Sequence, residues 1–201
     1  MSAKTQAPPR ASARERLLAA ADELFYEGGV HTVGIDRVIE RAGVAKASLY
    51  SIFGSKDELI RSYLTARHEA RKQRITRGLA RYETPRSRLL GVFDVLGEAI
   101  AEPGFRGCAF ANASAEAPPG SAAVQVSDES RAWMLALLAD LARAAGAADP
   151  ERLARQLMLL YDGASVAARM DRDPAAAAMA RAAAATLLDA PGTLADASAG
   201  R

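Results

Sequence analysis

The chain has 201 residues and is half hydrophobic, with 5% aromatic residues, one cysteine and a formal net charge of +2. The low aromatic content and the few β-branched runs favour helices over sheet. No apolar stretch is free enough of charge to predict a membrane span, and residues 1–10 lack the apolar run of a secretory signal. A single cysteine excludes an intramolecular disulfide framework and is typical of a reducing cytoplasm. We therefore expect a cytoplasmic, all-α protein.

The small net charge conceals an asymmetry along the chain. Residues 1–82 carry 15 Lys and Arg against 9 Asp and Glu, a net charge of +6. The remaining residues carry 11 against 15, a net charge of −4. A basic first part predicts a polyanionic partner for that part alone, although most charged protein faces are simply solvated.

Three short helices are predicted near the N-terminus. Ser12 and Glu15 have the spacing of a capping box and open a helix that ends near Gly28. Thr32 is expected to cap the second helix, and the third covers residues 45–53. The three helices predict a small domain that follows a flexible tail.

Gly43 allows a tight turn between the second and third of these helices. Two short amphipathic helices joined in this way are typical of a helix-turn-helix, whose second helix can lie in the major groove of DNA. We therefore predict a flexible tail over residues 1–11 and a helix-turn-helix DNA-binding domain over residues 12–54.

Residues 55–189 are predicted to form a second, larger helical domain. Ser55 and Glu58 make another capping box and begin a long linking helix over residues 55–81. Thr84 and Pro85 read as a cap followed by proline at the first helical position. Further helices are expected over residues 84–100, 127–145, 149–170 and 173–188, with a short apolar element at 108–115 and a disordered tail at 190–201.

A series of short motifs runs through residues 13–64. They are Ala20-Ala21-Asp22-Glu23-Leu24-Phe25, Gly28-Gly29, Thr32 with Ile35 and Ile39, Ala42-Gly43-Val44, Leu49-Tyr50, Phe53 and Ser55-Lys56-Asp57-Glu58-Leu59. In order and spacing they resemble the DNA-binding domain of the TetR/AcrR family of bacterial repressors. Ser51 and Ile52 depart from the commonest family pattern, which leaves the operator sequence open but not DNA binding.

This resemblance implies an all-α homodimer. Three N-terminal helices would bind DNA, and the larger C-terminal part would hold a ligand pocket and the dimer interface. The last two long helices, residues 149–170 and 174–188, would pair with their copies in a four-helix bundle. The alanine-rich second helix suits close helix approach, but simple helix propensity explains its composition equally well.

The residues expected to touch DNA lie on the third helix and at two helix N-termini. Lys46 can reach guanine O6 and N7 or a phosphate, and Ala47 is small enough to meet a thymine methyl. The resemblance places the hydroxyl of Tyr50 on a phosphate, although a core aromatic is the alternative. Thr32 and Lys56 are expected as phosphate anchors, and a plain cap is compatible with that role for Thr32. The predicted DNA-binding residues are Thr32, Lys46, Ala47, Ser48, Tyr50, Ser51 and Lys56.

A second group of residues is predicted to wall a pocket for a small apolar or amphipathic effector. Each of them could instead belong to an ordinary core. Asn112 and Tyr161 could supply directional hydrogen bonds to such a ligand. The predicted pocket residues are Phe93, Leu96, Cys108, Phe110, Asn112, Trp133, Leu137 and Tyr161.

Together these features predict a ligand-responsive transcriptional regulator, a repressor released from a palindromic operator by a small-molecule effector. One alternative is a thiol sensor, in which Arg106 lowers the pKa of Cys108. The competing interpretation of Cys108 is an inert, buried cysteine. Another is a DNA-bound factor that recruits a protein through its acidic part. His31 and His68 match no metal-ligand or catalytic-triad spacing, so no catalytic residue, cofactor or metal site is predicted.

Overall fold

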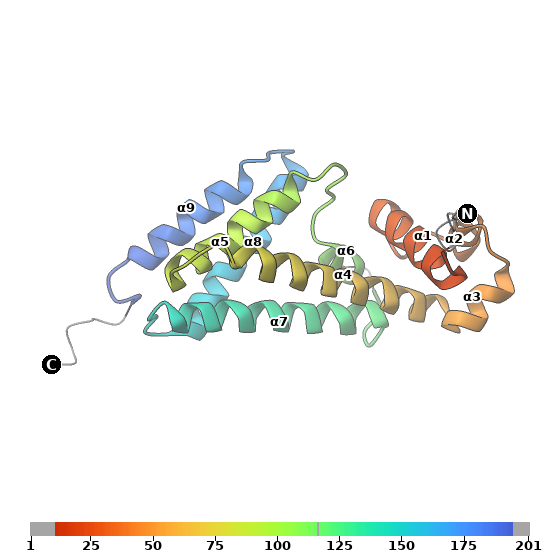
Figure 1. The fold of residues 1–201 in the computed structure, drawn as a ribbon, viewed down its shortest axis with the longest axis horizontal. Helices are drawn as coiled ribbons and strands as arrows, with labels where there is room; N and C mark the ends of the chain where they lie inside the picture. The colour runs from red at the N-terminus through yellow and green to blue at the C-terminus, as the bar shows by residue number, and fades with distance from the viewer. Residues whose placement is uncertain (1–10, 116, 195–201) are drawn as a thin grey trace, which may run out of the picture. The chain divides into compact units, whose positions relative to one another are not determined.

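The computed structural model describes residues 11–115 and 117–194, and these form nine α-helices and no strand. The predicted all-α fold is therefore confirmed. Two compact units, residues 1–63 and 64–201, divide the chain within α4 (Figure 1). The helices are α1 (Ala13–Gly28), α2 (Ile35–Ala42), α3 (Lys46–Phe53), α4 (Lys56–Leu79), α5 (Pro85–Ile100), α6 (Ala109–Ser114), α7 (Ala122–Ala144), α8 (Pro150–Met170) and α9 (Ala176–Asp189).

The start of α1 confirms the predicted capping box. The hydroxyl of Ser12 accepts a hydrogen bond from the Glu15 N–H at 3.2 Å, and the Glu15 carboxylate accepts one from the Ser12 N–H at 2.7 Å. These two bonds satisfy backbone donors that a helix N-terminus leaves free. They also hold the pKa of Glu15 below its ordinary value.

The first unit packs α1, α2, α3 and the start of α4 around a small apolar core. Leu17, Val38, Leu49 and Leu59 are fully buried there. Because each comes from a different helix, the core fixes how α3 lies against α1 and α2.

The predicted cap of the second helix is wrong. Gly34, not Thr32, is the N-cap of α2, and it makes no side-chain capping bond. Val33 is buried, and its N–H donates to the Gly29 carbonyl at 3.2 Å. Burying Val33 keeps the preceding residues in a turn, which leaves Thr32 exposed two residues before the N-cap.

The linking helix α4 begins as predicted but ends two residues earlier. The Ser55 hydroxyl accepts a hydrogen bond from the Glu58 N–H at 3.1 Å. At the other end, Leu79 is buried and Tyr82 turns onto α5, where its hydroxyl donates to Asp94 at 2.7 Å. This contact fixes the segment that follows α4 against α5.

The second unit packs α5, α7, α8 and α9 against one another, with the short α6 beside α7. Thr84 caps α5 as predicted, and Pro85 occupies its first turn. The core of this unit is mainly apolar, although Ser127, Ser130 and Ser165 are also buried in the unit. Its fully buried large side chains include Phe93, Leu89, Met134, Leu138, Leu157 and Leu188.

Two helix starts in the second unit differ from the prediction. Helix α7 begins at Ala122, five residues before the predicted start, where Ser121 caps it. The extra turn is buried through small side chains, which carry too weak a periodic signal to read from the sequence. Helix α9 begins at Ala176, because the Asp173 carboxylate accepts from the Ala175 N–H at 2.8 Å and holds a turn there.

The predicted disordered tail over residues 190–201 is wrong for its first part. The Ala148 N–H donates to the Thr193 carbonyl at 2.9 Å, and Leu194 makes an isolated antiparallel bridge with Ala147. Residues 195–201, like the predicted tail at residues 1–10, lie outside the described residues. Within the described chain, no helix is long and apolar enough to cross a membrane.

Candidate functional site

Helix α3 follows a tight turn and presents one face to solvent. Gly43 has a left-handed backbone, with φ of 61° and ψ of 45°, that residues with a side chain rarely adopt. Leu49 and Phe53 hold the inner face of α3 in the core. On the opposite face Lys46, Ala47, Tyr50 and Ser51 are exposed, and Ser48 is half-buried. The structure thus brings five of the seven predicted DNA-binding residues together on α3.

The ammonium of Lys46 is ion-paired with a carboxylate of α2. Its Nζ lies 2.9 Å from Oδ1 of Asp36, and the two side chains are 60% and 82% exposed. The hydrogen bond and the charge of Asp36 raise the pKa of Lys46. Water screens such an exposed pair, so it holds the lysine only weakly. Sequence reasoning missed Asp36, which lies ten residues before Lys46 on another helix.

The two predicted phosphate anchors lie in different surroundings. Thr32 is exposed in the turn before α2. Lys56 is the first residue of α4 and is half-buried, with its Nζ 6.0 Å from the ring centre of Phe25. This partial burial lowers the pKa of Lys56. The helix N-terminus at Lys56 suits an anion, whereas Thr32 lies outside α2.

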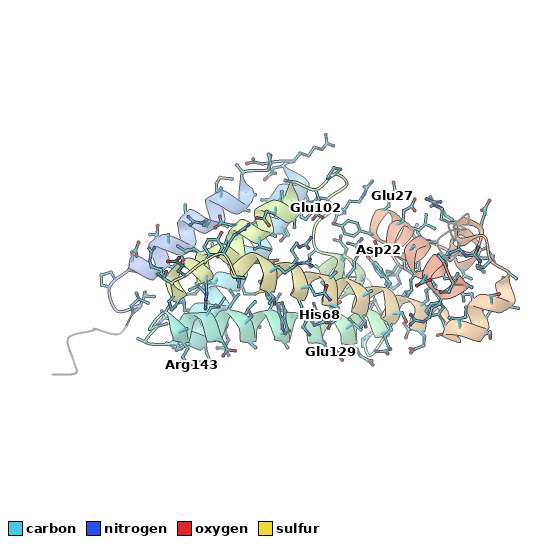
Figure 2. All side chains as sticks on the ribbon, viewed as in Figure 1. Asp22, Glu27, His68, Glu102, Glu129 and Arg143 are labelled. Atoms are coloured by element: carbon cyan, nitrogen blue, oxygen red, sulfur yellow. The ribbon has the colours of Figure 1, made fainter. Side chains whose placement is uncertain are left out.

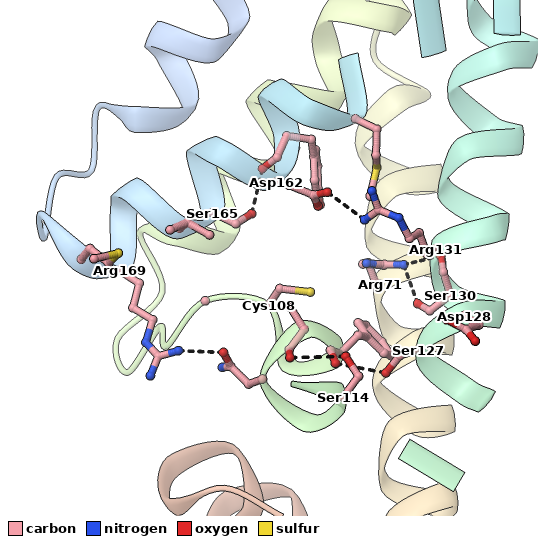
Figure 3. Close-up of a pocket in the computed structure, with 18 residues that line it drawn as sticks. Arg71, Cys108, Ser114, Ser127, Asp128, Ser130, Arg131, Asp162, Ser165 and Arg169 are labelled. Atoms are coloured by element: carbon pink, nitrogen blue, oxygen red, sulfur yellow. Dashed lines mark hydrogen bonds and ion pairs between the residues drawn. The ribbon is translucent and has the colours of Figure 1, made fainter. Parts of the chain in front are cut away.

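A pocket of about 610 Å³ lies within the second unit, between α4, α6, α7 and α8 (Figure 3). Four of the predicted pocket residues line it, namely Cys108, Phe110, Asn112 and Tyr161. The volume is that of a pocket for a drug-sized molecule. Four of the eight predicted pocket residues therefore line one pocket.

The other four predicted residues do not line this pocket. Phe93 and Leu96 are buried in the core between helices, and Leu137 is partly buried against the same core. Trp133 packs edge-on against His68, with ring centres 5.6 Å apart. They are apolar residues on the core side of their helices, and helical spacing alone does not distinguish a core from a pocket wall.

Polar side chains pair across the pocket (Figure 3). Arg131 of α7 lies 2.8 Å from Asp162 of α8, and Arg169 donates to the amide oxygen of Asn112 at 2.7 Å. The fully buried Ser130 faces α4, where the Arg71 guanidinium donates to its carbonyl at 2.8 Å. These contacts join helices that are far apart in the sequence.

The sequence does carry a signal for two of the missed arginines. Arg71 lies four residues before the buried Ile75, so the two share one face of α4. Arg169 follows Tyr161 and Ser165 at the same spacing on α8. A cation on a buried helix face is unusual and could have marked the site.

His68 of α4 lies beside α7, the helix that carries Glu129 (Figure 2). Its Nδ1 is 2.9 Å from the Ser130 hydroxyl. Burial lowers the pKa of His68, and the charges of Arg71 and Lys72 lower it further, against a smaller opposite effect of Glu69 and Glu129. His68 is therefore neutral at neutral pH. Among the described residues, no group of three His, Cys, Asp or Glu side chains could hold a metal ion.

A different surface of the second unit is apolar and exposed. Leu159, Val166 and Met170 of α8 are between 53% and 75% exposed, and Met179 of α9 is 57% exposed. Helices α8 and α9 pack against each other. Large apolar side chains exposed on adjacent helices are typical of a surface that another protein covers.

Comparison with known proteins gives consistent results along the chain. The family model for bacterial regulatory proteins of the tetR family matches residues 17–63. A TetR-family transcriptional regulator from Streptomyces coelicolor is 33% identical over 88% of this chain and 94% of its own, with a TM-score of 0.83. A TetR-type regulator structure from Streptomyces avermitilis is 35% identical over 92% of this chain and all of its own, with a TM-score of 0.80.

One curated relative matches over a short stretch of the chain. The transcriptional activator FasR of Mycolicibacterium smegmatis is 49% identical over 51 residues, which are 25% of this chain and 23% of FasR. The match therefore spans less than a quarter of the length of FasR.

Proposed function

Because this chain belongs to the TetR family of bacterial regulators and is therefore a DNA-binding transcriptional regulator rather than an enzyme, we propose that a small-molecule effector controls it. The protein would be a repressor, and the effector would release it from a palindromic operator. The observation that carries it is the 610 Å³ pocket in the second unit. A pocket of this size favours a ligand-responsive protein over a factor that only recruits another protein. A regulator of chromosomal genes would act in the cytoplasm.

The proposed DNA contacts are those of the exposed face of α3. Tyr50 would place its hydroxyl on a phosphate, and Lys46 would leave Asp36 for a guanine edge or a phosphate. Ala47, Ser48 and Ser51 complete the face. Thr32 and Lys56 would contact the flanking backbone.

We further propose a homodimer that buries the exposed apolar residues of α8 and α9. The two copies of α3 would then enter successive major grooves, about one helical turn apart. Val166 and Met170 belong both to the pocket lining and to this exposed apolar surface. A bound effector would therefore act on the same part of α8 that holds the partner.

Effector and DNA must favour different conformations for this to be a switch. Helix α4 belongs to both units and contributes Arg71 to the pocket. A shift of α4 on effector binding would change the spacing of the two copies of α3. The lower operator affinity would then follow from the difference in effector affinity between the two conformations.

The first test is selection of bound fragments from genomic DNA, followed by titration of the operator found. Lys46→Ala should weaken operator binding about tenfold, as expected for loss of a base or phosphate contact. Arg152→Ala, an exposed cation on the first turn of α8, is the matched control and should bind normally. Unchanged affinity of Lys46→Ala would reject the role of that residue. A reporter gene behind the operator distinguishes repression from the activation for which FasR is named.

A thiol sensor is the second candidate function. Cys108 lines the pocket and is partly exposed, so a small oxidant or electrophile could reach its sulfur. The Cys108→Ser variant should then bind the operator normally and stay bound when oxidant is added. If that variant still responds to oxidant, the thiol mechanism is wrong.

A further inference from the structure

The charged side chains of the pocket do not balance one another. Arg131 is neutralised by Asp162, as described above. Within the described chain, neither Arg71 nor Arg169 has a carboxylate at ion-pair distance, and the remaining acidic lining residue, Asp128, is exposed. The pocket therefore carries an excess of positive charge.

Arg71 is the more deeply placed of the two arginines. Its guanidinium lies 4.7 Å from the ring centre of Phe110 and 5.8 Å from that of Trp133. Its bonds go to the carbonyl and hydroxyl of Ser130, which are neutral acceptors, and its Nε is buried without a hydrogen-bond partner. A half-buried cation without a counter-ion is costly, because burial removes water and neutral partners replace it only in part.

Tyr161 supplies a second polar group on the pocket wall. Its side chain is buried and lines the pocket. Burial raises the pKa of this hydroxyl, while the charge of Arg71 acts in the opposite direction. The hydroxyl is therefore protonated at neutral pH and can donate a hydrogen bond.

Large apolar side chains form another part of the lining. Phe110, Met158, Val166 and Met170 contribute carbon and sulfur surface to the pocket. An apolar body fits this surface, and the flexible methionines adapt to its shape.

We infer that the pocket binds an amphipathic carboxylate, whose anionic group pairs with Arg71 and accepts from Tyr161 while its apolar body lies against Phe110 and the methionines. The ligand would supply the counter-ion that Arg71 lacks. Bonds between a guanidinium and a carboxylate are about twice as strong as neutral ones, so charge should dominate the choice of ligand. This inference rests on the proposed function, and it specifies the chemical class of its effector.

The test compares probes that differ only in the charge of the head group. Decanoate, decanamide and decylamine share one apolar chain, and 2-naphthoate and its amide repeat the comparison with an aromatic body. Trp133, the only tryptophan of the chain, lies beside Arg71 and reports binding by its fluorescence without DNA. Decanoate should bind about tenfold more tightly than decanamide, and decylamine most weakly.

Two substitutions locate the selectivity. Arg71→Gln should reduce decanoate binding to the level of decanamide and leave decanamide within about twofold. Tyr161→Phe should weaken decanoate about fivefold. Arg77→Gln, an exposed arginine of the same helix that does not line the pocket, should change neither.

If neither carboxylate binds the unaltered protein more tightly than its amide, the inference is wrong. That comparison needs no variant, so it decides the matter even where Arg71→Gln does not fold. If decylamine binds most tightly and releases the protein from the operator, the inferred carboxylate ligand is wrong and the proposed function stands. If decanoate binds through Arg71 and leaves operator affinity unchanged, the carboxylate site stands and effector release is wrong.

Discussion

The two units of this protein hold their cations in different ways. On α3, Lys46 is well exposed and shares its charge with Asp36. In the pocket, Arg71 is half-buried and contacts Ser130 and the rings of Phe110 and Trp133. Water screens the first pair, so the lysine can exchange Asp36 for a phosphate at small cost. The positive charge of Arg71 is screened less, because little solvent surrounds it, and it therefore favours an anionic ligand.

Loss of core packing in the first unit should have the largest effect and should separate the behaviour of the two units. Leu49→Ala removes a fully buried side chain that holds α3 in the first unit, and such a change costs about 2–5 kcal/mol. We expect operator binding to be lost, while decanoate binding in the second unit, followed by Trp133 fluorescence, stays within about twofold. Leu49→Met conserves volume and is the control. If Leu49→Ala also abolished ligand binding, the two units would not be independently stable.

A smaller effect is expected where helix α5 meets the end of α4. A Cβ on Gly91 would overlap the ring of Tyr82, which the bond to Asp94 holds in place. Gly91→Ala should therefore lower the free energy of unfolding of the second unit by about 1–3 kcal/mol in urea titrations. Gly97→Ala, on the same helix, meets Ala177 at an ordinary 3.5 Å and should be neutral or stabilising. Equal stability of the two variants would contradict the packing argument.

Asp36→Asn tests how weakly α2 holds Lys46. The pair is exposed, so the midpoint of thermal unfolding should not change measurably. Operator affinity should rise about two- to tenfold, because an anion is removed next to the DNA phosphates and the lysine is released. Fluorescence anisotropy at several salt concentrations measures this. A fall in affinity would instead mean that Asp36 positions Lys46 for DNA.

The smallest effect should come from the neutral imidazole of His68. The pKa of His68 is lowered in the folded state, so below its ordinary value near 6.5 the unfolded chain binds more protons than the folded one. Stability of the second unit should therefore fall as pH drops from about 6.5 towards the folded pKa, and be constant above. In His68→Gln this part of the pH dependence should disappear from urea titrations. An unchanged pH profile would show that His68 does not titrate in this window.

The features of the fold that could be predicted were those that depend on residues close together in the sequence. The caps at Ser12 and Thr84 were correct, because a capping box involves residues three apart. The cap at Thr32 was wrong, since the burial of Val33 outweighed it. The start of α7 was missed for a related reason, because its first buried residues are small.

The pocket was only partly predictable. Cys108 and Phe110 were found because an apolar segment between loops is unusual in a helical chain. Phe93 and Leu96 were assigned to the same pocket, yet they fill the core. Arg71 was missed although it shares a helix face with Ile75, and only its contacts with Ser130 and Phe110, at least 39 residues away in sequence, assign it to the pocket.

The sequence by itself determined the all-α fold, the helix-turn-helix and the family, because caps, glycine turns and helical spacing all act over a few residues. The tertiary structure alone decided which side chains meet. It paired Lys46 with Asp36, brought Tyr161 and Arg71 from different helices to one pocket, and buried Phe93 in the core. These outcomes depend on how helices far apart in the sequence pack, and packing is a property of the whole unit that no local pattern records.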